Sequence, residues 1–593
     1  MISCGTAAVA PGAIFASSIG GRQYPTFTSY REAIDKTAPG EYFFRAEGLG
    51  RFGLFQRERG AASRLADAAE SAFGGLGFRC ETLEALARMP PLSGLEVELA
   101  AGGRGCVFRF APRSQHVSAL CRADNAYVIA IPYASRPELG AFVRHFDGPV
   151  KAEWFGVAPG KVSSASWASF LQVLPYFEHG GVLPPGELFH DGDIVVSNTV
   201  LAGSPSGTTL VARRPDRSWI RLQGEQPKLQ DMRIVVADSD RRLRNTEAHA
   251  IVGFGARGLH IENVSVSGAA GAGIYLRECI GGRIERCTVT HTKADGFHLT
   301  HGTRGIAVTN CHAMETGDDG FAVVSYAGTR FGICRDIRFE DVVSERSSAR
   351  GLAIVGGQRV TALRPKVTHS GAAGCYVSSE AAYDTYGTLE CRLESPLVIE
   401  AGQSAKINNA AIQIGGRAGS SAGPDGAWYS NASIDCTVTD ARIEGGGSGL
   451  RAAVALDPYS ERCVVSGVYA ENVVGNQHRP ADLVQLNGFA GRVERVRARN
   501  IGGFVLNVGR TATGRQALTD AEVEEPRTGR VRYPGLVFVQ PAPGLKSLFL
   551  QDIKVELSHA QSAGRSSFVN RSASVAATKL VLSRVTVNGE AIR

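Results

Sequence analysis

The sequence lacks the long apolar runs that would mark a membrane protein or an exported precursor. No stretch approaches the roughly 18 apolar residues of a membrane-spanning helix. The segment from Met1 to Ala16 has no basic start and no long apolar core, so we expect no signal peptide. These absences predict a protein that is made in a cytoplasm and has no membrane partner.

Metal-binding and nucleic-acid-binding patterns are also missing. The 12 cysteines form no Cys-x-x-Cys pair and show no zinc-ligand spacing, so we expect reduced structural thiols, no metal and no cofactor. The formal charge of +7 is small for 593 residues and comes from scattered arginines rather than basic runs. Nucleic acid is therefore not an expected partner.

Glycine, in contrast, is abundant, with 71 residues, and some of it marks a repeat in the middle third of the chain. Each repeat is a glycine followed by an alternating apolar triplet, which suits a short strand after a turn. Their glycines are spaced by 23, 24 and 31 residues, in the strings Gly273–Leu276, Gly296–Leu299, Gly320–Val323 and Gly351–Ile354.

A second series of residues keeps the same irregular rhythm. Steps of 23, 24 and 31 residues separate Val264, Cys287, Cys311 and Val342. Two series with one shared spacing indicate a solenoid, and short strands without helical patterns between them indicate a right-handed parallel β-helix. The extra residues of the longest step, about 326–332, are expected to form a loop that projects from one coil. The predicted fold class is all-β, with small mixed domains at the N-terminus.

The chain is too long for a single ordinary core, so we divide it into four parts. Residues 1–75 and 76–150 are expected to form two small N-terminal domains, with helices over 61–72 and 80–87, the second capped by Thr82. Residues 151–533 form the β-helix, opened by a helix over 167–174. Residues 534–593 are either further coils or a separate small β-domain.

Register brings acidic residues together, because successive coils of such a solenoid lie roughly 4.8 Å apart. Asp295, Asp319 and Arg350 each precede a repeat glycine and are expected to stack as one column, with Asp318 beside it. Glycoside hydrolysis needs one protonated acid and one carboxylate that acts as base or nucleophile. Crowding of carboxylates raises one pKa and so supplies the acid. The predicted catalytic residues are therefore Asp295, Asp318 and Asp319.

Other polar and aromatic residues near this column are candidates for substrate binding. His298 is expected to point outward between Tyr275 and Ala322, and carboxylates beside tyrosines suit the hydroxyl groups and faces of sugars. The predicted binding residues are His298, Tyr326, Arg350, Tyr376, Glu380 and Asp384. An alternative places the active site about two coils further along, at Glu380 and Asp384.

The motifs Asp295-Gly, Gly317-Asp-Asp319 and 349–356 resemble successive motifs of the polygalacturonase family. The resemblance implies that Asp318 or Asp319 is the general acid and that Asp295, with the other, activates water. Arg350 stands where that family has a histidine.

Three segments, 317–326, 351–357 and 374–380, are similar to bacteriophage tailspike depolymerases, and so are 151–156 and 181–186 near the front. This resemblance implies a homotrimer in the virion tail, made in the host cytoplasm. Residues 1–75 would bind the tail or an adaptor protein, 76–150 would be the neck, and the β-helix would cut bacterial capsule or lipopolysaccharide. We expect hydrolysis; a lyase that uses Arg350 beside Asp319, or a non-catalytic adhesin, remains an alternative.

Overall fold

The computed structural model describes residues 15–19, 22–27, 38–39, 41–48, 51–58, 61–70, 76–92, 95–100, 106–161, 164–192, 194–476, 478, 480–525, 536–557, 569–571 and 579–592. The chain forms two compact units. The first comprises Met1–Val157 and Ala165–Val182, and the second comprises Ala158–Ser164 and Leu183–Arg593. Within the described residues, no helix combines the length and the apolar character that crossing a bilayer requires.

The first unit contains a mixed sheet of ten strands packed with short helices. Its buried core includes Phe44, Phe108 and Phe142. In spatial order the strands are β1 (Phe15–Ile19), β2 (Arg22–Phe27), β3 (Tyr42–Gly48), β4 (Arg51–Glu58), β5 (Ala61–Glu70), β6 (Leu76–Cys80), β7 (Glu96–Leu99), β8 (Cys106–Pro112), β10 (Gly140–His145) and β9 (Ala130–Pro132). The helices are α2 (Leu83–Ala87), α3 (Gln115–Ala123) and α4 (Ser164–Val173).

One prediction for this unit, the helix over 61–72, is wrong. Residues 61–70 form strand β5, which pairs antiparallel with β4 on one side and β6 on the other. The alanine-rich sequence favours a helix locally, but strand partners on both sides satisfy its backbone, and such tertiary pairing overrides propensity. The other two helices are confirmed as α2 and α4, and the Thr82 hydroxyl caps α2 by accepting from the Ala85 N–H at 3.1 Å.

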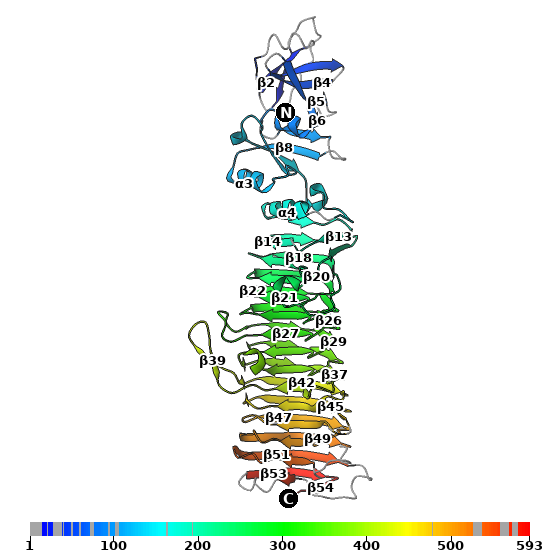
Figure 1. The fold of residues 1–593 in the computed structure, drawn as a ribbon, viewed down its shortest axis with the longest axis vertical. Helices are drawn as coiled ribbons and strands as arrows, with labels where there is room; N and C mark the ends of the chain where they lie inside the picture. Colours follow the sequence, from blue (N-terminus) through cyan, green and yellow to red (C-terminus); the bar gives the residue numbers. More distant parts are fainter. Residues whose placement is uncertain are drawn as a thin grey trace. The chain divides into compact units, whose positions relative to one another are not determined.

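The second unit is a parallel β-helix whose coils stack regularly (Figure 1). One of its parallel sheets has fourteen strands, which we call the fourteen-stranded sheet. They are, in order, β14 (Ile194–Ser197), β17 (Ile220–Gln223), β19 (Ile251–Phe254), β21 (Ile274–Arg277), β24 (Phe297–Thr300), β27 (Phe321–Val324), β30 (Leu352–Val355), β34 (Cys375–Ser378), β38 (Asn409–Ile414), β43 (Leu450–Leu456), β46 (Asp482–Leu486), β48 (Leu506–Val508), β50 (Val537–Val539) and β52 (Val569–Arg571).

A longer sheet, which we call the long sheet, forms the other walls of the coils. Its strands in this unit include β18 (Lys228–Val236), β20 (Arg257–Ser267), β22 (Ile280–Glu285), β23 (Thr288–Thr290), β25 (Arg304–Thr309), β26 (His312–Met314), β28 (Arg338–Glu340), β29 (Val343–Glu345), β32 (Thr361–Leu363), β42 (Thr437–Glu444), β45 (Val464–Glu471), β47 (Arg492–Arg499), β49 (Gly514–Glu524), β51 (Leu545–Glu556) and β53 (Lys579–Val587). Because β51 and β53 pair in parallel with the preceding strands, the coil pattern continues toward the C-terminus.

The predicted register is confirmed. Strands β21, β24, β27 and β30 each begin one residue after a repeat glycine, and Phe297 pairs with Phe321, which pairs with Leu352. The rings of Phe297 and Phe321 stack inside the coil with centroids 4.6 Å apart. Cys287 and Cys311 are buried and free, as expected.

Close packing, rather than a left-handed backbone, explains the repeat glycines. A Cβ atom on Gly320 would lie 2.1 Å from the Ser344 Oγ, and one on Gly296 would lie 2.6 Å from the Gly320 carbonyl oxygen. Neither glycine has a positive φ. Glycine is needed here because the neighbouring wall and the next coil leave no room for a side chain.

One series of left-handed positions lies at another corner and carries side chains. Residues 263, 286, 310 and 341 have φ values of 51°, 52°, 52° and 51°, and each immediately precedes a member of the inward series that starts at Val264. We call this set the left-handed corner. Its N–H groups donate to the following coil, for example Asn310 to the Glu340 carbonyl at 3.0 Å. This bond stabilises a conformation that most non-glycine residues disfavour.

Candidate functional site

The acidic residues form the column that the repeat predicts, on the edge of the fourteen-stranded sheet. Asp295, Asp319 and Arg350 each lie two residues before β24, β27 and β30. The Asp319 N–H donates to Asp295 Oδ1 at 3.0 Å, and the Arg350 N–H donates to Asp319 Oδ1 at 2.8 Å. Each carboxylate is thus fixed by the backbone of the next coil, which leaves its second oxygen for other contacts.

Asp318 brings a third carboxylate to this column. One carboxylate oxygen from each of Asp295, Asp318 and Asp319 lies within 4.8 Å of the others. The Asp295 and Asp319 residues are only 5% and 4% exposed, whereas the Asp318 side chain is 29% exposed. Asp318 is therefore the member of this acidic cluster that reaches solvent most readily.

His298 contacts the acidic cluster rather than open solvent. Its Nδ1 lies 2.6 Å from Asp295 Oδ2, and the residue is 7% exposed. It lies between Tyr275 and Ala322 in register, as expected, and its ring stacks on Tyr275 with centroids 5.3 Å apart. This contact makes His298 a positioning partner of Asp295 and leaves only a small part of it for substrate.

The three carboxyl groups differ in their affinity for a proton. Burial acts to raise the pKa of Asp295, but the hydrogen bond from His298 and the charges of His298 and Arg242 outweigh it, so this pKa lies below its usual value. Burial and the charge of Asp295 raise the pKa of Asp318, although Arg242 opposes them. Burial raises the pKa of Asp319 well above its usual value, despite the neighbouring charge of Arg350. The cluster thus combines one carboxyl group that loses its proton more readily than usual with two that hold their protons to higher pH.

Arg350 connects the acidic cluster to two of the predicted binding residues. Its guanidinium forms an ion pair with Glu380, lies over the Tyr376 ring at 4.6 Å and places Nη1 3.7 Å from Asp319 Oδ2. Tyr326 packs against a buried apolar group on the same face that includes Ala322 and Tyr376. Five of the six predicted binding residues therefore lie around one surface.

Asp384 is held by a different arginine. Its side chain is 61% exposed and pairs with Arg417 at 2.5 Å, in a loop that bonds to the one carrying Tyr326 through Ala327 N–H and the Asp384 carbonyl. Tyr383 beside it is 63% exposed, whereas Tyr386 is fully buried. Glu380 and Asp384 are thus each paired with a different arginine, Arg350 and Arg417.

Two residues of the site were missed by the sequence reasoning. Arg242 Nη1 lies 2.5 Å from Asp318 Oδ2, and His249 stacks on Tyr275 with centroids 4.3 Å apart. His249 lies two residues before β19, the position that Asp295 holds in its own coil, so the register could have identified it. Burial and the nearby His298 lower the pKa of His249 to about 3, so it is neutral and accepts from the Ala272 N–H at 2.7 Å. Arg242 lies in the loop between β18 and β19, where no repeat could place it.

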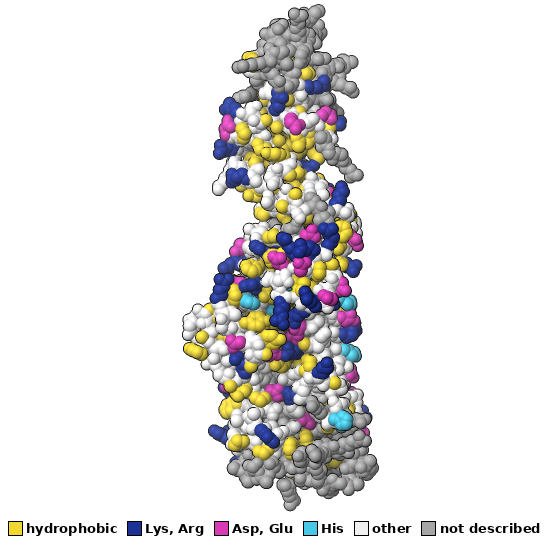
Figure 2. Space-filling model, in the orientation of Figure 1, with side chains coloured by type: hydrophobic (Ala, Val, Ile, Leu, Met, Phe, Trp, Pro, Cys, Tyr) yellow, Lys and Arg dark blue, Asp and Glu magenta, His cyan; other side chains and the backbone are white. Residues whose placement is uncertain are grey.

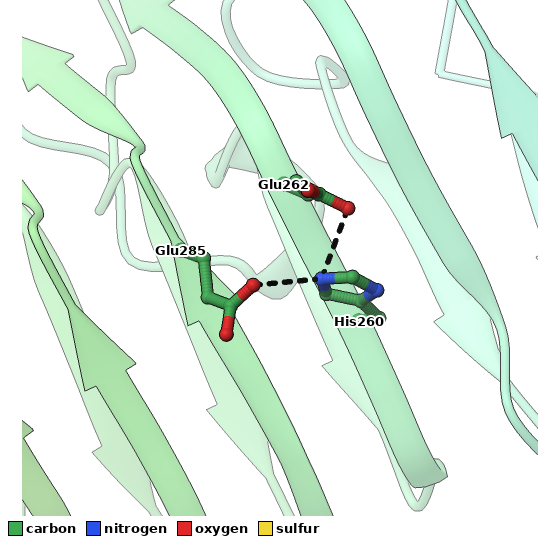
Figure 3. A group of neighbouring side chains, drawn as sticks. All are labelled: His260, Glu262 and Glu285. Atoms are coloured by element: carbon green, nitrogen blue, oxygen red, sulfur yellow. Dashed lines mark ion pairs between the residues drawn. The ribbon is translucent and has the colours of Figure 1, made fainter.

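Within the part of the chain that the structure describes, two clusters of three side chains have the donor atoms for a cation. The acidic cluster offers carboxylate oxygens, the ligands that calcium prefers, but Arg242 already places a positive charge there. The other lies on the long sheet (Figure 3), where His260 Nε2 is 3.2 Å from Glu262 and 3.4 Å from Glu285. Lys228 lies 2.9 Å from Glu262 and Arg283 contacts the other imidazole nitrogen, so fixed cations already balance these carboxylates.

Comparison with known proteins agrees with the fold. The family described as right handed beta helix region matches residues 238–388, so the predicted fold class, including its handedness, is confirmed. A search of curated proteins found no match.

Several solved structures are similar to this chain at low identity. An alpha-1,3-glucanase catalytic unit from Streptomyces thermodiastaticus is 14% identical, covers 76% of this chain and 72% of its own, and has a TM-score of 0.47. The adhesin PfbA of Streptococcus pneumoniae is 11% identical over 60% of this chain and 91% of its own, with a TM-score of 0.45. Gene product 12 of bacteriophage phi29 is 12% identical, covers 69% of this chain and 62% of its own, and has a TM-score of 0.45. At these identities and TM-scores, the similarity says nothing about activity.

Proposed function

We propose that this protein is a glycoside hydrolase that binds and cleaves a bacterial surface polysaccharide, either capsule or lipopolysaccharide. The observation that supports this proposal most directly is the acidic cluster, whose three carboxylates lie together with opposed proton affinities. Hydrolysis of a glycosidic bond requires this combination of a proton donor and an ionised carboxylate.

In the proposed reaction, Asp318 or Asp319 donates its proton to the glycosidic oxygen as the bond from that oxygen to the anomeric carbon breaks. Asp295, held ionised by His298, takes a proton from water as the water oxygen bonds to the anomeric carbon. Asp318 is the better placed donor because its side chain is more exposed than that of Asp319. Tyr326, Arg350, Tyr376 and Glu380 line the same surface and would bind the sugars.

The biological setting that we propose is a bacteriophage tailspike. The motifs that resemble tailspike depolymerases support a homotrimer made in the host cytoplasm and carried in the virion tail. Residues 1–75 would attach it to the tail or to an adaptor protein.

A polysaccharide lyase is a second candidate, favoured by one observation. Arg350 Nη1 lies 3.7 Å from Asp319 Oδ2, so a cation stands beside a carboxyl group as proton abstraction would require. The lyase would abstract a ring proton and break the other bond of the glycosidic oxygen, on the side of the neighbouring sugar, by elimination, which leaves that sugar with an unsaturated end.

One experiment separates these activities. The purified protein is incubated with a panel of capsules and lipopolysaccharides, and reducing ends, ultraviolet absorbance and product masses are measured. Hydrolysis gives new reducing ends and products that each carry one added water, without new absorbance. An unsaturated end would show a lyase, and binding without any new reducing end would show an adhesin.

A further inference from the structure

A second polar surface lies on the fourteen-stranded sheet, several coils beyond the acidic cluster. It is a cleft of about 390 Å³, lined mainly by carboxamide side chains and one arginine, namely Asn408, Arg451, Gln485, Asn487, Asn507 and Gln540. This volume is at the lower end of the range for small-ligand pockets. We call it the amide cleft, and no predicted site residue lies in it.

A buried carboxylate fixes the carboxamides of this cleft. Asp482 is 5% exposed and accepts from Gln485 Nε2 at 2.7 Å, Asn507 Nδ2 at 2.9 Å and the Phe504 N–H at 2.9 Å. Gln540 Nε2 in turn donates to Asn507 Oδ1 at 3.4 Å. The amide groups are thus held in fixed orientations, which lowers the entropic cost of binding a polar ligand.

The charges around the cleft are paired within the protein. The Arg451 guanidinium bonds to Asp457 and to Gln485, and the Arg451 and Asp457 side chains are each only 15% exposed. An anionic ligand would therefore find an arginine that is already neutralised. A carboxamide both donates and accepts, so it matches a hydroxyl or acetamido group better than a charged one.

The amide cleft and the acidic cluster are connected by one continuous register of side chains. Consecutive parallel pairings align His298, Ala322, Ala353, Tyr376, Gln413, Ala455, Gln485, Asn507 and Phe538. Five strand-to-strand steps separate Ala322 from Gln485, which corresponds to roughly 24 Å at 4.8 Å a step. At the far end, Phe538 stacks on Phe504 with centroids 5.2 Å apart. An aromatic ring beside carboxamides suits the apolar face of a sugar ring.

From these observations we propose that the amide cleft is a second glycan-binding site, which takes neutral hexose or N-acetylhexosamine residues of a polysaccharide lying along the fourteen-stranded sheet. The polysaccharide ligand is shared with the proposed function, so the test measures binding independently of cleavage. The site would hold the polymer several sugars away from the bond that is cut.

The test uses the full-length protein carrying Asp319→Asn, which keeps the polymer intact. Purified capsular polysaccharides and lipopolysaccharide O-chains, grouped into neutral and uronic-acid-containing polymers, are cast in native gels, and retardation of the protein gives Kd. Asn487→Ala with Gln540→Ala removes two carboxamides whose internal bonds are both 3.4 Å long, so the fold should be retained. Gln551→Ala, on β51 of the long sheet, is the matched control.

We expect at least one polymer with neutral residues to bind, and the double variant to bind it at least about fivefold more weakly while Gln551→Ala binds normally. Equal binding by the double variant and the control, or retardation by no polymer, would overturn the proposal. If the double variant loses binding but the parent protein cleaves no polymer, only the proposed hydrolase fails. If the parent protein cleaves a polymer and the double variant binds it as tightly as the control does, only the proposal for the amide cleft fails.

Discussion

At the scale of single residues, Asp295 and Asp319 occupy equivalent positions in successive coils but have opposite proton affinities. The difference comes from their neighbours. His298 Nδ1 lies 2.6 Å from Asp295 Oδ2, whereas the ion pair between Arg350 Nη1 and Asp319 Oδ2 is longer, at 3.7 Å. The neighbours of Asp295 therefore outweigh the effect of burial on its pKa, whereas burial dominates the pKa of Asp319.

The first prediction concerns the acidic cluster. Asp295→Asn, Asp318→Asn and Asp319→Asn should each lower kcat by a factor of about 10² or more, because each removes a proton donor or acceptor. Reducing-end release measures the rates. The pKa of Asp319 is raised, so its ionisation costs stability as pH rises through the folded-state value. Asp319→Asn should therefore melt no lower than the parent at neutral pH.

The alternative active site, at Glu380 and Asp384, predicts a different result. If all three variants keep parental rates while Glu380→Gln or Asp384→Asn abolishes release of reducing ends, then catalysis lies in the loop after β34.

The second prediction concerns pH. The profile of kcat/KM should be bell-shaped, with an acid limb from Asp295 below the usual aspartate range and an alkaline limb from the Asp318–Asp319 pair above it. Arg242 lowers the pKa of both Asp295 and Asp318, so Arg242→Gln should move both limbs to higher pH. Arg241→Gln, one residue away, is the control. Unmoved limbs in Arg242→Gln would show that this ion pair does not tune the reaction.

At the scale of elements, the absence of a side chain at the repeat glycines lets the neighbouring wall and the next coil approach closely. The third prediction is that Gly320→Ala lowers the free energy of unfolding by about 1–3 kcal/mol, the usual cost of overpacking. The added Cβ would lie 2.1 Å from Ser344 Oγ and 2.7 Å from the Gly351 carbonyl oxygen. Chemical denaturation measures the change.

Gly332→Ala is the matched control, since the nearest atom to its Cβ would be Pro424 Cγ at 3.9 Å. Equal stability of the two variants would mean that the wall around Gly320 yields more readily than its contacts indicate.

The sequence specified the repeating elements better than the isolated ones. The shared spacing of two series predicted the coils, the register of Asp295, Asp319 and Arg350, and the inward cysteines, because a solenoid translates sequence period directly into contacts. No period reaches Arg242, which approaches Asp318 from a loop 76 residues earlier in the chain. The helix predicted over 61–72 was wrong, since residues 61–70 form β5 and local propensity carries no information about strand partners.

At the scale of the whole molecule, the described charges are mixed. On the face in Figure 2, basic and acidic side chains of the β-helix lie interspersed, so this face shows no large region of one sign that would oppose association of chains. The fourth prediction is a stable trimer, with a mass in light scattering three times the 62.8 kDa of one chain. A monomer at micromolar concentration would contradict it, and the proposed tailspike assembly with it.

The left-handed corner has a consequence for how such a protein can change its length. Each coil must place an equivalent residue at the left-handed corner so that its inward side chains align with those of the next coil. Extra residues are therefore confined to the loops, as in the 31-residue step that carries Tyr326. Beyond that, the β-helix can grow or shrink only by complete turns, each worth roughly 4.8 Å. The distance between the acidic cluster and the amide cleft can therefore change only in steps of one whole coil, so the number of coils between them sets how far apart the two sites lie.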